Sequence, residues 1–314
     1  METTQVLGLL SEDDPVSGKE IADEFGVSRN AVWKHIERLR DAGFEIDSDP
    51  KGYVLTSPAE YGDFGLSYHL NSETIGTEIE YRDEVPSTNS VASQLARDGA
   101  PEGTVVLADV QRQGKGRRGR EWTSPSGGVW MSTVLRPEIP PRSASVITVA
   151  ASVAVARGLE EAGVGPRIKW PNDVLVDGKK ICGILVEIQA DAESLEHAVV
   201  GIGINANVDI EDDDWNATSV KDEVGHEVNR AELAASVLEE LEDLYSLASD
   251  DGDRKMVFEE WKEYSDTIGR EVRVETPTET IEGEAVGVDD TGALRVETSD
   301  GERVVTAGDC EHLR

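Results

Sequence analysis

The chain has few cysteines, few basic residues and no long apolar run. Its two cysteines, Cys182 and Cys310, lie far apart among 314 residues, so the composition requires neither a disulfide nor a zinc site and fits a reducing compartment. No stretch of about 18 uncharged apolar residues appears, which argues against a membrane span. The N-terminal residues lack a basic leader with a cleavage site, so we expect a cytoplasmic protein with no membrane partner.

Basic residues are outnumbered by acidic ones, 30 against 64, and the formal net charge is −34. Such a charge normally argues against nucleic-acid binding, because phosphates repel it. The acidic residues are spread over the whole chain. This pattern suggests a halophilic protein in a salt-rich cytoplasm, where screening acts within about 3 Å at 1 M salt. The alternative is an ordinary acidic protein, and full stability in dilute buffer would favour it.

The sequence divides into three predicted segments. Residues 1–60 should form helices followed by a hairpin, residues 66–268 should alternate strands and helices, and residues 269–314 should form short strands. The stretch Ser57–Ser67 contains one proline and two glycines and is expected to be a linker. The length allows two or three domains.

The first segment has the pattern of a winged helix-turn-helix. A first helix starts near Thr3, and the pair Ser17 and Glu20 has the spacing of a capping box that opens a second helix. Ser28 can cap a third helix over residues 28–40, in which apolar residues recur at helical spacing. Short strands on either side of Pro50-Lys-Gly52 predict a two-stranded wing.

The predicted third helix is basic although its domain is acidic. It carries four basic residues and one acidic residue, whereas residues 1–60 hold 6 basic and 13 acidic residues. This contrast favours a helix that enters the major groove of DNA over a helical domain for protein contacts. The candidate DNA-binding residues are Ser28, Arg29, Asn30, Lys34 and Lys51.

The third segment predicts a small SH3-like barrel. Val272–Val274, Ile281–Val288 and Ala293–Glu297 alternate as strands, and Asp290-Thr-Gly292 and Asp300-Gly301 supply turns. This segment alone implies no chemistry.

The central segment contains a glycine-rich basic run, from Gln111 to Trp122, after a predicted strand over Thr104–Val110. Within it, three glycines over residues 114–119 and four cations over residues 115–120 precede an aromatic ring. Backbone N–H groups and cations are what a phosphate-bearing ligand needs. The alternatives are a solvated basic loop or a nucleic-acid patch, which the surrounding acidity disfavours. The loop 112–122 is expected to be mobile when empty and to order over a ligand.

This run, Gly114-Lys-Gly-Arg-Arg-Gly-Arg-Glu-Trp122, resembles the GRGRRGR signature of biotin–protein ligases. Four further motifs resemble those of this family, in the same order. They are Pro86-Ser-Thr-Asn89, Lys169-Trp-Pro-Asn-Asp173, Lys180-Ile-Cys-Gly-Ile-Leu185 and Gly201-Ile-Gly-Ile-Asn205. The outer segments also resemble those of the subgroup that represses biotin operons. The resemblance therefore covers nearly the whole chain. Lys115 departs from it, because many members carry arginine there; the charge is kept but bidentate geometry is lost.

The resemblance implies an α+β fold class: an N-terminal winged helix-turn-helix, a central mixed α/β catalytic domain of the biotin/lipoate-ligase type, and a C-terminal SH3-like β-barrel. It implies ATP-dependent formation of biotinyl-5′-AMP, with release of diphosphate. Biotin is then transferred to a lysine of the biotin carboxyl carrier domain of an acetyl-CoA or other acyl-CoA carboxylase. A homodimer that binds operator DNA and represses biotin genes is also implied. Mg²⁺ is expected with ATP, although no ligand cluster identifies its site.

The resemblance also assigns the site. The residues expected to be catalytic are Lys180, Arg117 and Asp173. Those expected to bind biotin are Ser87, Thr88, Asn89, Gln111, Lys115, Gly116, Arg117 and Lys180. Those expected to bind ATP are Arg117, Arg118, Arg120, Trp122, Asn172, Lys180 and Asn205. Arg117 and Lys180 must then share one pocket, where their charges offset the repulsion between a carboxylate and a triphosphate.

The residues alone leave plainer interpretations open. Ser87–Asn89 could merely cap a helix, and Lys169–Asp173 could be a polar turn at a strand end. Lys180, which the predicted turn Val176–Lys179 aims along the next strand, could be a snorkelling lysine. Gly201–Asn205 is expected to follow a strand over Ala198–Val200. It fails as a dinucleotide fingerprint, because the G-x-G-x-x-G pattern is incomplete.

Two other functions compete with the ligase. One is a DNA-binding regulator that only senses biotin, which turnover of ATP with biotin would exclude. The other is a lipoate or octanoate transferase, which shares the central fold and which the continuous basic run disfavours. A structural interaction module would leave the cation cluster unexplained.

Overall fold

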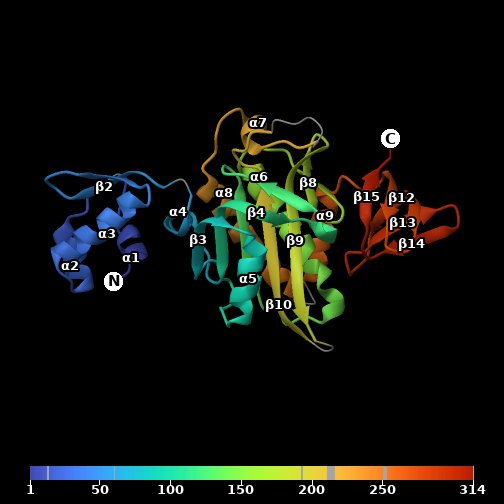
Figure 1. Ribbon diagram of the computed structural model, residues 1–314, viewed down its shortest axis with the longest axis horizontal. Helices are drawn as coiled ribbons and strands as arrows, with labels where there is room; N and C mark the ends of the chain where they lie inside the picture. Colours follow the sequence, from blue (N-terminus) through green and yellow to red (C-terminus); the bar gives the residue numbers. More distant parts are fainter. Residues whose placement is uncertain (13, 60, 192–193, 211–215, 250–252, 314) are drawn as a thin grey trace.

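The computed structural model describes residues 1–12, 14–59, 61–191, 194–210, 216–249 and 253–313. A helical N-terminal unit and a C-terminal sheet lie on opposite sides of a large central sheet with its helices (Figure 1). This mixed α and β architecture is the predicted one.

The N-terminal unit is a winged helix-turn-helix. Its elements are α1 (Thr3–Leu7), α2 (Gly18–Phe25), α3 (Arg29–Asp41), β1 (Glu45–Ser48) and β2 (Tyr53–Ser57). The predicted capping box is confirmed, since Ser17 accepts from the Glu20 N–H at 3.1 Å and Glu20 accepts from the Ser17 N–H at 3.0 Å. Ser28 caps α3 by accepting from Ala31 N at 3.2 Å. β1 and β2 pair antiparallel as the predicted wing.

The expected linker, Ser57–Ser67, is not an open linker, and that expectation was wrong. A helix, α4 (Asp63–His69), begins inside it. Leu66 is buried in the core of the central part, whereas Phe64 and Tyr68 pack against the core of the N-terminal unit. Apolar side chains of one short helix thus enter two cores, and this burial outweighs the turn tendency of the glycines.

The central sheet has eight strands in the order β3-β4-β6-β10-β9-β8-β7, with β5 paired to β4. Among the strands that the structure describes, β3 and β4 are the one parallel pair. The strands are β3 (Ile79–Val85), β4 (Val105–Lys115), β5 (Glu121–Ser124), β6 (Val129–Leu135), β7 (Arg167–Lys169), β8 (Asp173–Val176), β9 (Lys179–Ala190) and β10 (Leu195–Ile204). The other elements are α5 (Thr88–Arg97), η1 (Arg117–Gly119), η2 (Pro141–Ser143), α6 (Ser145–Glu161), α7 (Val220–Val224), α8 (Arg230–Ser249) and α9 (Arg254–Tyr264).

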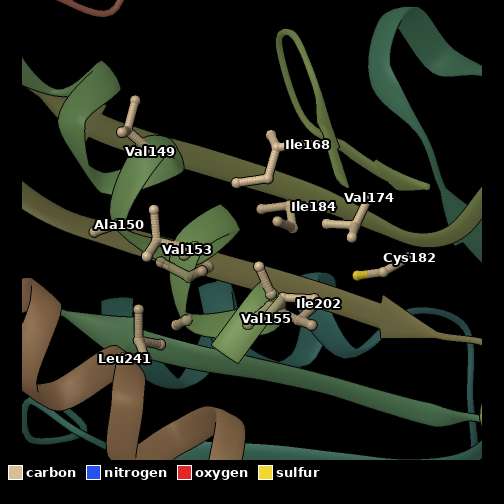
Figure 2. Close-up of a cluster of buried hydrophobic side chains, with 14 of the residues drawn as sticks. Val149, Ala150, Val153, Val155, Ile168, Val174, Cys182, Ile184, Ile202 and Leu241 are labelled. Atoms are coloured by element: carbon tan, nitrogen blue, oxygen red, sulfur yellow. The ribbon is translucent and has the colours of Figure 1, made fainter. Parts of the chain in front are cut away.

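Helices cover both faces of this sheet. Because side chains alternate along a strand, Val106 and Val134 pack under α5, while their neighbours Val105 and Leu135 join the main core with α6 and α8. Figure 2 shows this main core, with side chains from α6, α8 and the sheet strands. Among the described helices, the stretch Pro141–Glu161 alone is long and apolar enough to cross a membrane, but 72% of its apolar window is buried. It is therefore the core helix of this domain.

The C-terminal part is a five-stranded antiparallel sheet in the order β14-β13-β12-β11-β15. Its strands are β11 (Glu271–Glu275), β12 (Thr280–Val288), β13 (Leu294–Thr298), β14 (Gly301–Val305) and β15 (Asp309–His312). The first three were predicted to within two residues. Its buried side chains, such as Val272 and Leu294, belong to the same apolar cluster as the central core. This continuity fixes the sheet beside the site described next.

Candidate active site

A cavity of about 330 Å³ lies at one end of the central sheet, against the C-terminal domain. Residues from all five sequence motifs line it. Both Arg117 and Lys180 are among them, so the shared pocket that the motifs required exists. The other lining residues named from the sequence are Ser87, Thr88, Asn89, Gln111, Lys115, Gly116, Arg120, Trp122, Asn172 and Asp173.

Two of the named residues lie elsewhere. Asn205 lines an adjoining cavity of about 520 Å³, whose wall it shares with Trp122 and Lys180. Arg118 is not among the residues that line either cavity. Its backbone has a left-handed φ of 55°, and its side chain is directed toward the C-terminal domain.

The polar residues before α5 form a network rather than a simple helix cap. Ser87 occupies the N-cap position, but no side-chain capping bond forms there among the described residues. Instead the N–H and hydroxyl of Thr88 donate to Gln111 Oε1 at 2.8 and 3.1 Å. Asn89 Nδ2 donates to Leu185 O at 3.2 Å and to Glu187 Oε2 at 2.9 Å. The capping interpretation is therefore inadequate, because these groups are oriented by strands rather than by their own helix.

Sequence reasoning missed three members of this network. Ser132 on β6 is fully buried, and its hydroxyl donates toward Thr88 Oγ1 at 2.8 Å and Asn89 Oδ1 at 2.7 Å. Glu187 accepts from Asn89, and Ser124 accepts from Gln111 Nε2 at 2.9 Å. The one available signal was Ser132, a hydroxyl within the otherwise apolar start of β6.

The last glycine motif lies inside a strand rather than after one. β10 extends from Leu195 to Ile204, so the expected strand over Ala198–Val200 was too short. A Cβ added at Gly201 would lie 2.0 Å from Asn89 Oδ1, and one at Gly203 would lie 2.9 Å from Trp122 Nε1. The glycines thus leave room on the sheet for these two side chains.

Lys180 points into the site. The predicted turn before it is confirmed, with positive φ at Asp177 (48°) and Gly178 (79°). Its Nζ donates to Asp173 Oδ1 at 2.6 Å and lies 4.8 Å from the centre of the Trp122 ring. A snorkelling lysine would instead extend its ammonium into solvent.

Arg117 lines the same cavity at its junction with the C-terminal domain. Its Nη1 donates to Asn172 Oδ1 and to Gly308 O, both at 3.2 Å. Burial lowers the pKa of Arg117, although a guanidinium remains charged near neutral pH. Asn172 is held in turn because its Nδ2 donates to Ile184 O at 2.7 Å. The site thus places a partly buried cation where an anion would be stabilised.

The basic run is more ordered than a plain loop. β4 continues past the expected end at Val110 to Lys115, because Gln111, Gly114 and Lys115 pair with β5. The end of this hairpin is joined to Asp309 of the C-terminal domain. The distances to the Asp309 carboxylate are 3.1 Å from Arg118 Nη1 and 2.6 Å from Arg120 Nη2.

A second candidate site lies on the N-terminal unit. Arg29, Asn30, Lys34 and Lys51 are exposed, while Ser28 caps α3 through its side chain. Arg40, counted above among the basic residues of this helix, instead donates to Ile46 O at 3.0 Å and faces the wing. Sequence reasoning missed Trp33, which is 48% exposed beside these cations.

Neither cysteine forms a disulfide, and both are buried. Burial raises the pKa of the Cys310 thiol to about 11. Among the residues that the structure describes, no group of three or more His, Cys, Asp or Glu side chains could hold a metal ion.

Comparisons with known proteins agree with this architecture. The model of the "Biotin/lipoate A/B protein ligase family" matches residues 81–205, that of the "Biotin protein ligase C terminal domain" matches residues 267–313, and an "HTH domain" model matches residues 2–54. The chain is 40% identical to "Bifunctional ligase/repressor BirA" of Bacillus subtilis, over 94% of this chain and 93% of the relative. The Escherichia coli protein of that name is 31% identical, over 93% and 91%. The structure of "Biotin protein ligase from Aquifex aeolicus in complex with biotin and ATP" aligns with a TM-score of 0.66 and 26% identity, over 76% of this chain and 99% of that one.

Proposed function

The chain belongs to the family of bifunctional biotin ligases and repressors, and from this premise we propose how its residues work. The activity is ATP-dependent biotin–protein ligation. The observation that supports the proposal is the single cavity lined by both Arg117 and Lys180.

In the first reaction, a carboxylate oxygen of biotin attacks the α-phosphorus of ATP. The bond from that phosphorus to the bridging oxygen of the β-phosphate breaks, and diphosphate leaves. Two anions must approach, so the charges of Arg117 and Lys180 offset their repulsion. Asp173 and Asn172 keep these cations in position, with contacts of 2.6 Å to Lys180 Nζ and 3.2 Å to Arg117 Nη1.

We propose that the ureido ring of biotin binds at the polar network below α5. The donors and acceptors come from Ser87, Thr88, Asn89 and Gln111. Ser132 holds the side chains of Thr88 and Asn89 in place. A buried polar network that is already satisfied loses little entropy when the ligand arrives. Lys115 and Gly116 then close the same cavity from the basic run.

The nucleotide would lie across the two adjoining cavities, whose shared wall is Trp122 and Lys180. Trp122 Nε1 is a buried donor with no partner in the described part of the chain. Such an orphan donor in a cavity wall is typical of a ligand site. Asn205 faces the outer cavity. Arg118 and Arg120 both pair with the Asp309 carboxylate. They would have to release Asp309 before they could bind a phosphate.

In the second reaction, the amine of an acceptor lysine attacks the carbonyl carbon of the mixed anhydride, and AMP leaves. We propose that Asp173 orients this amine or takes its proton. The acceptor is a biotin carboxyl carrier protein, and we propose the carrier domain of an acyl-CoA carboxylase. Mg²⁺ would neutralise phosphate charge when it arrives with ATP, and no residue is proposed as its ligand.

The N-terminal unit is a DNA-binding domain, and we propose that it represses biotin genes. Arg29 and Asn30 would contact bases, and Lys34 and Lys51 would contact phosphates.

A homodimer would present two such units to a palindrome. Its interface would be the free edge of β9, because β8 pairs with β9 only as far as Gly183 and no other described strand occupies that side beyond it. We propose a cytoplasmic location, and domains over residues 1–60, 66–268 and 269–314.

The test is incubation of the full chain with biotin, ATP labelled at the α-phosphate, and a carrier domain. It should be run at high salt, because the net charge is −34. The expected result is labelled biotinyl-AMP, followed by biotin on a carrier lysine. No adenylate would refute the ligase, and modification with lipoate in place of biotin would indicate the transferase.

A further inference from the structure

Three residues, Trp170, Thr267 and His312, form a hydrogen-bonded chain from the C-terminal sheet to the edge of the site, and Asp266 lies beside its far end. The backbone N–H of Trp170 donates to Thr267 Oγ1 at 3.0 Å, and this hydroxyl lies 3.1 Å from Nε2 of His312. Nδ1 of His312 lies 3.6 Å from Asp266 Oδ2. His312 ends β15, whereas Thr267 lies between α9 and β11. The ring therefore joins separate segments to the strand end that carries Trp170.

The burial of the Thr267 hydroxyl favours one protonation state of the ring. Thr267 Oγ1 already accepts from Trp170, so its own hydrogen needs an acceptor. Thr267 is 0% exposed, and among the described residues its hydroxyl has only His312 Nε2 as an acceptor. This arrangement favours a neutral ring with its proton on Nδ1, toward Asp266. A proton on Nε2 would leave the buried hydroxyl hydrogen unsatisfied, which is unfavourable.

This chain of hydrogen bonds, called the tether below, acts on the segment that holds the cations of the site. Trp170 begins residues 170–173, which line the cavity. Two residues later, Asn172 accepts from Arg117 at 3.2 Å, and Asp173 accepts from Lys180 at 2.6 Å. A shift of the backbone at Trp170 would therefore move both contacts, and small misplacements of this kind are costly in catalysis.

We propose that His312 is a positioning residue whose protonation makes adenylate formation fail in acid. The proposal rests on the ligase function proposed above. While the ring is neutral, Thr267 holds Trp170, and Asn172 and Asp173 keep their positions. Once Nε2 carries a proton, the Thr267 hydroxyl can no longer donate to the ring, so its buried hydrogen has no acceptor among the described residues and Thr267 must shift. That shift loosens the support for the two cations.

The surroundings of the ring keep it neutral near pH 7. Burial is the main cause that lowers the pKa of His312 below its ordinary 6.5; Lys169 and Arg270 lower it further, and Asp266 raises it. Because the pKa is lower in the folded chain than in the unfolded chain, the unfolded chain binds more protons between the two values. The stability that the neutral His312 ring gives the folded chain is thus complete above pH 6.5. It is lost as the pH falls through the lowered pKa of His312.

The test is the pH profile of diphosphate release, from pH 4.5 to 8, at saturating ATP and biotin. We expect the wild-type kcat to fall about tenfold per pH unit below an inflection that lies under pH 6.5. His312→Gln supplies an amide acceptor that does not titrate, so this acid limb should vanish. His226→Gln removes an exposed histidine and should leave it unchanged. The Michaelis constant for biotin should change less than kcat. An unchanged acid limb in His312→Gln would overturn the proposal.

A spectroscopic measurement can test the tautomer of His312 without relying on ligase activity. Nitrogen-15 NMR of the histidine rings should show His312 with its proton on Nδ1 at pH 7.5, and Thr267→Val should abolish this preference whereas Thr267→Ser should keep it. A proton on Nε2 in the wild type would contradict the geometry even in an active enzyme. A protein that makes no adenylate at any pH but shows the expected tautomer would refute the proposed function and leave the tether intact.

Discussion

Replacement of Lys180 by alanine should abolish adenylate formation while the chain remains folded. The Lys180 ammonium is one of two cations placed to offset the meeting of two anions. At about 4 Å and an effective dielectric constant of about 20, one such charge contributes about 4 kcal/mol. We therefore expect diphosphate release to fall on the order of 10³-fold.

The expected loss of stability is much smaller. The side chains of Lys180 and Asp173 are 29% and 26% exposed, so their ion pair adds about 1 kcal/mol at most, and the contact with the Trp122 ring adds about 0.5 to 1 kcal/mol. The melting temperature should fall by only a few degrees. The matched control is Lys179→Ala, which removes the exposed neighbour on the same strand. Normal diphosphate release by Lys180→Ala, or equal losses in both variants, would refute the reasoning.

Three further outcomes are expected. Glu242→Gln should lower the free energy of unfolding at pH 7 by about 2 kcal/mol, because this carboxylate accepts from the backbone N–H groups of residues 73–75 at 2.7 to 2.9 Å. Desolvation would raise the pKa of Glu242, but the hydrogen bonds outweigh it and lower that pKa. Denaturant titrations should therefore show the difference in unfolding free energy between wild type and variant above pH 4.5, and the difference should disappear in stronger acid. Gly201→Ala should raise the Michaelis constant for biotin roughly tenfold, since its Cβ would lie 2.0 Å from Asn89 Oδ1; an unchanged constant would exclude Asn89 from the biotin site. Lys34→Ala should weaken binding to all DNA sequences and lower the slope of log K against log salt by about 1; loss of sequence preference instead would make Lys34 a base contact.

Features set by residues close together in the chain could be predicted. The capping box of Ser17 and Glu20, the cap at Ser28 and the turn at Asp177 and Gly178 depend on side chains within three or four positions. The site motifs were found because five short patterns occur in order. Their meeting in one cavity could be expected from a resemblance but not from the spacing alone.

Features set by distant residues could not be predicted. Asp309 pairs with arginines 189 and 191 positions away, and no local pattern marks it. The helix in the expected linker forms because two cores bury its apolar residues, which outweighs the turn signals. β10 extends through Gly201 and Gly203 although glycine weakens strands, because this stretch pairs with both β6 and β9. The glycines leave the space that Asn89 and Trp122 require.

The most direct test of the account is a double-mutant cycle on Arg117 and Lys180, measured as biotin-dependent exchange of labelled diphosphate into ATP. If both cations act on the same pair of anions, each single alanine variant should lose nearly as much activity as the double variant. Losses that simply multiply would show that Arg117 and Lys180 act independently and would contradict the shared site.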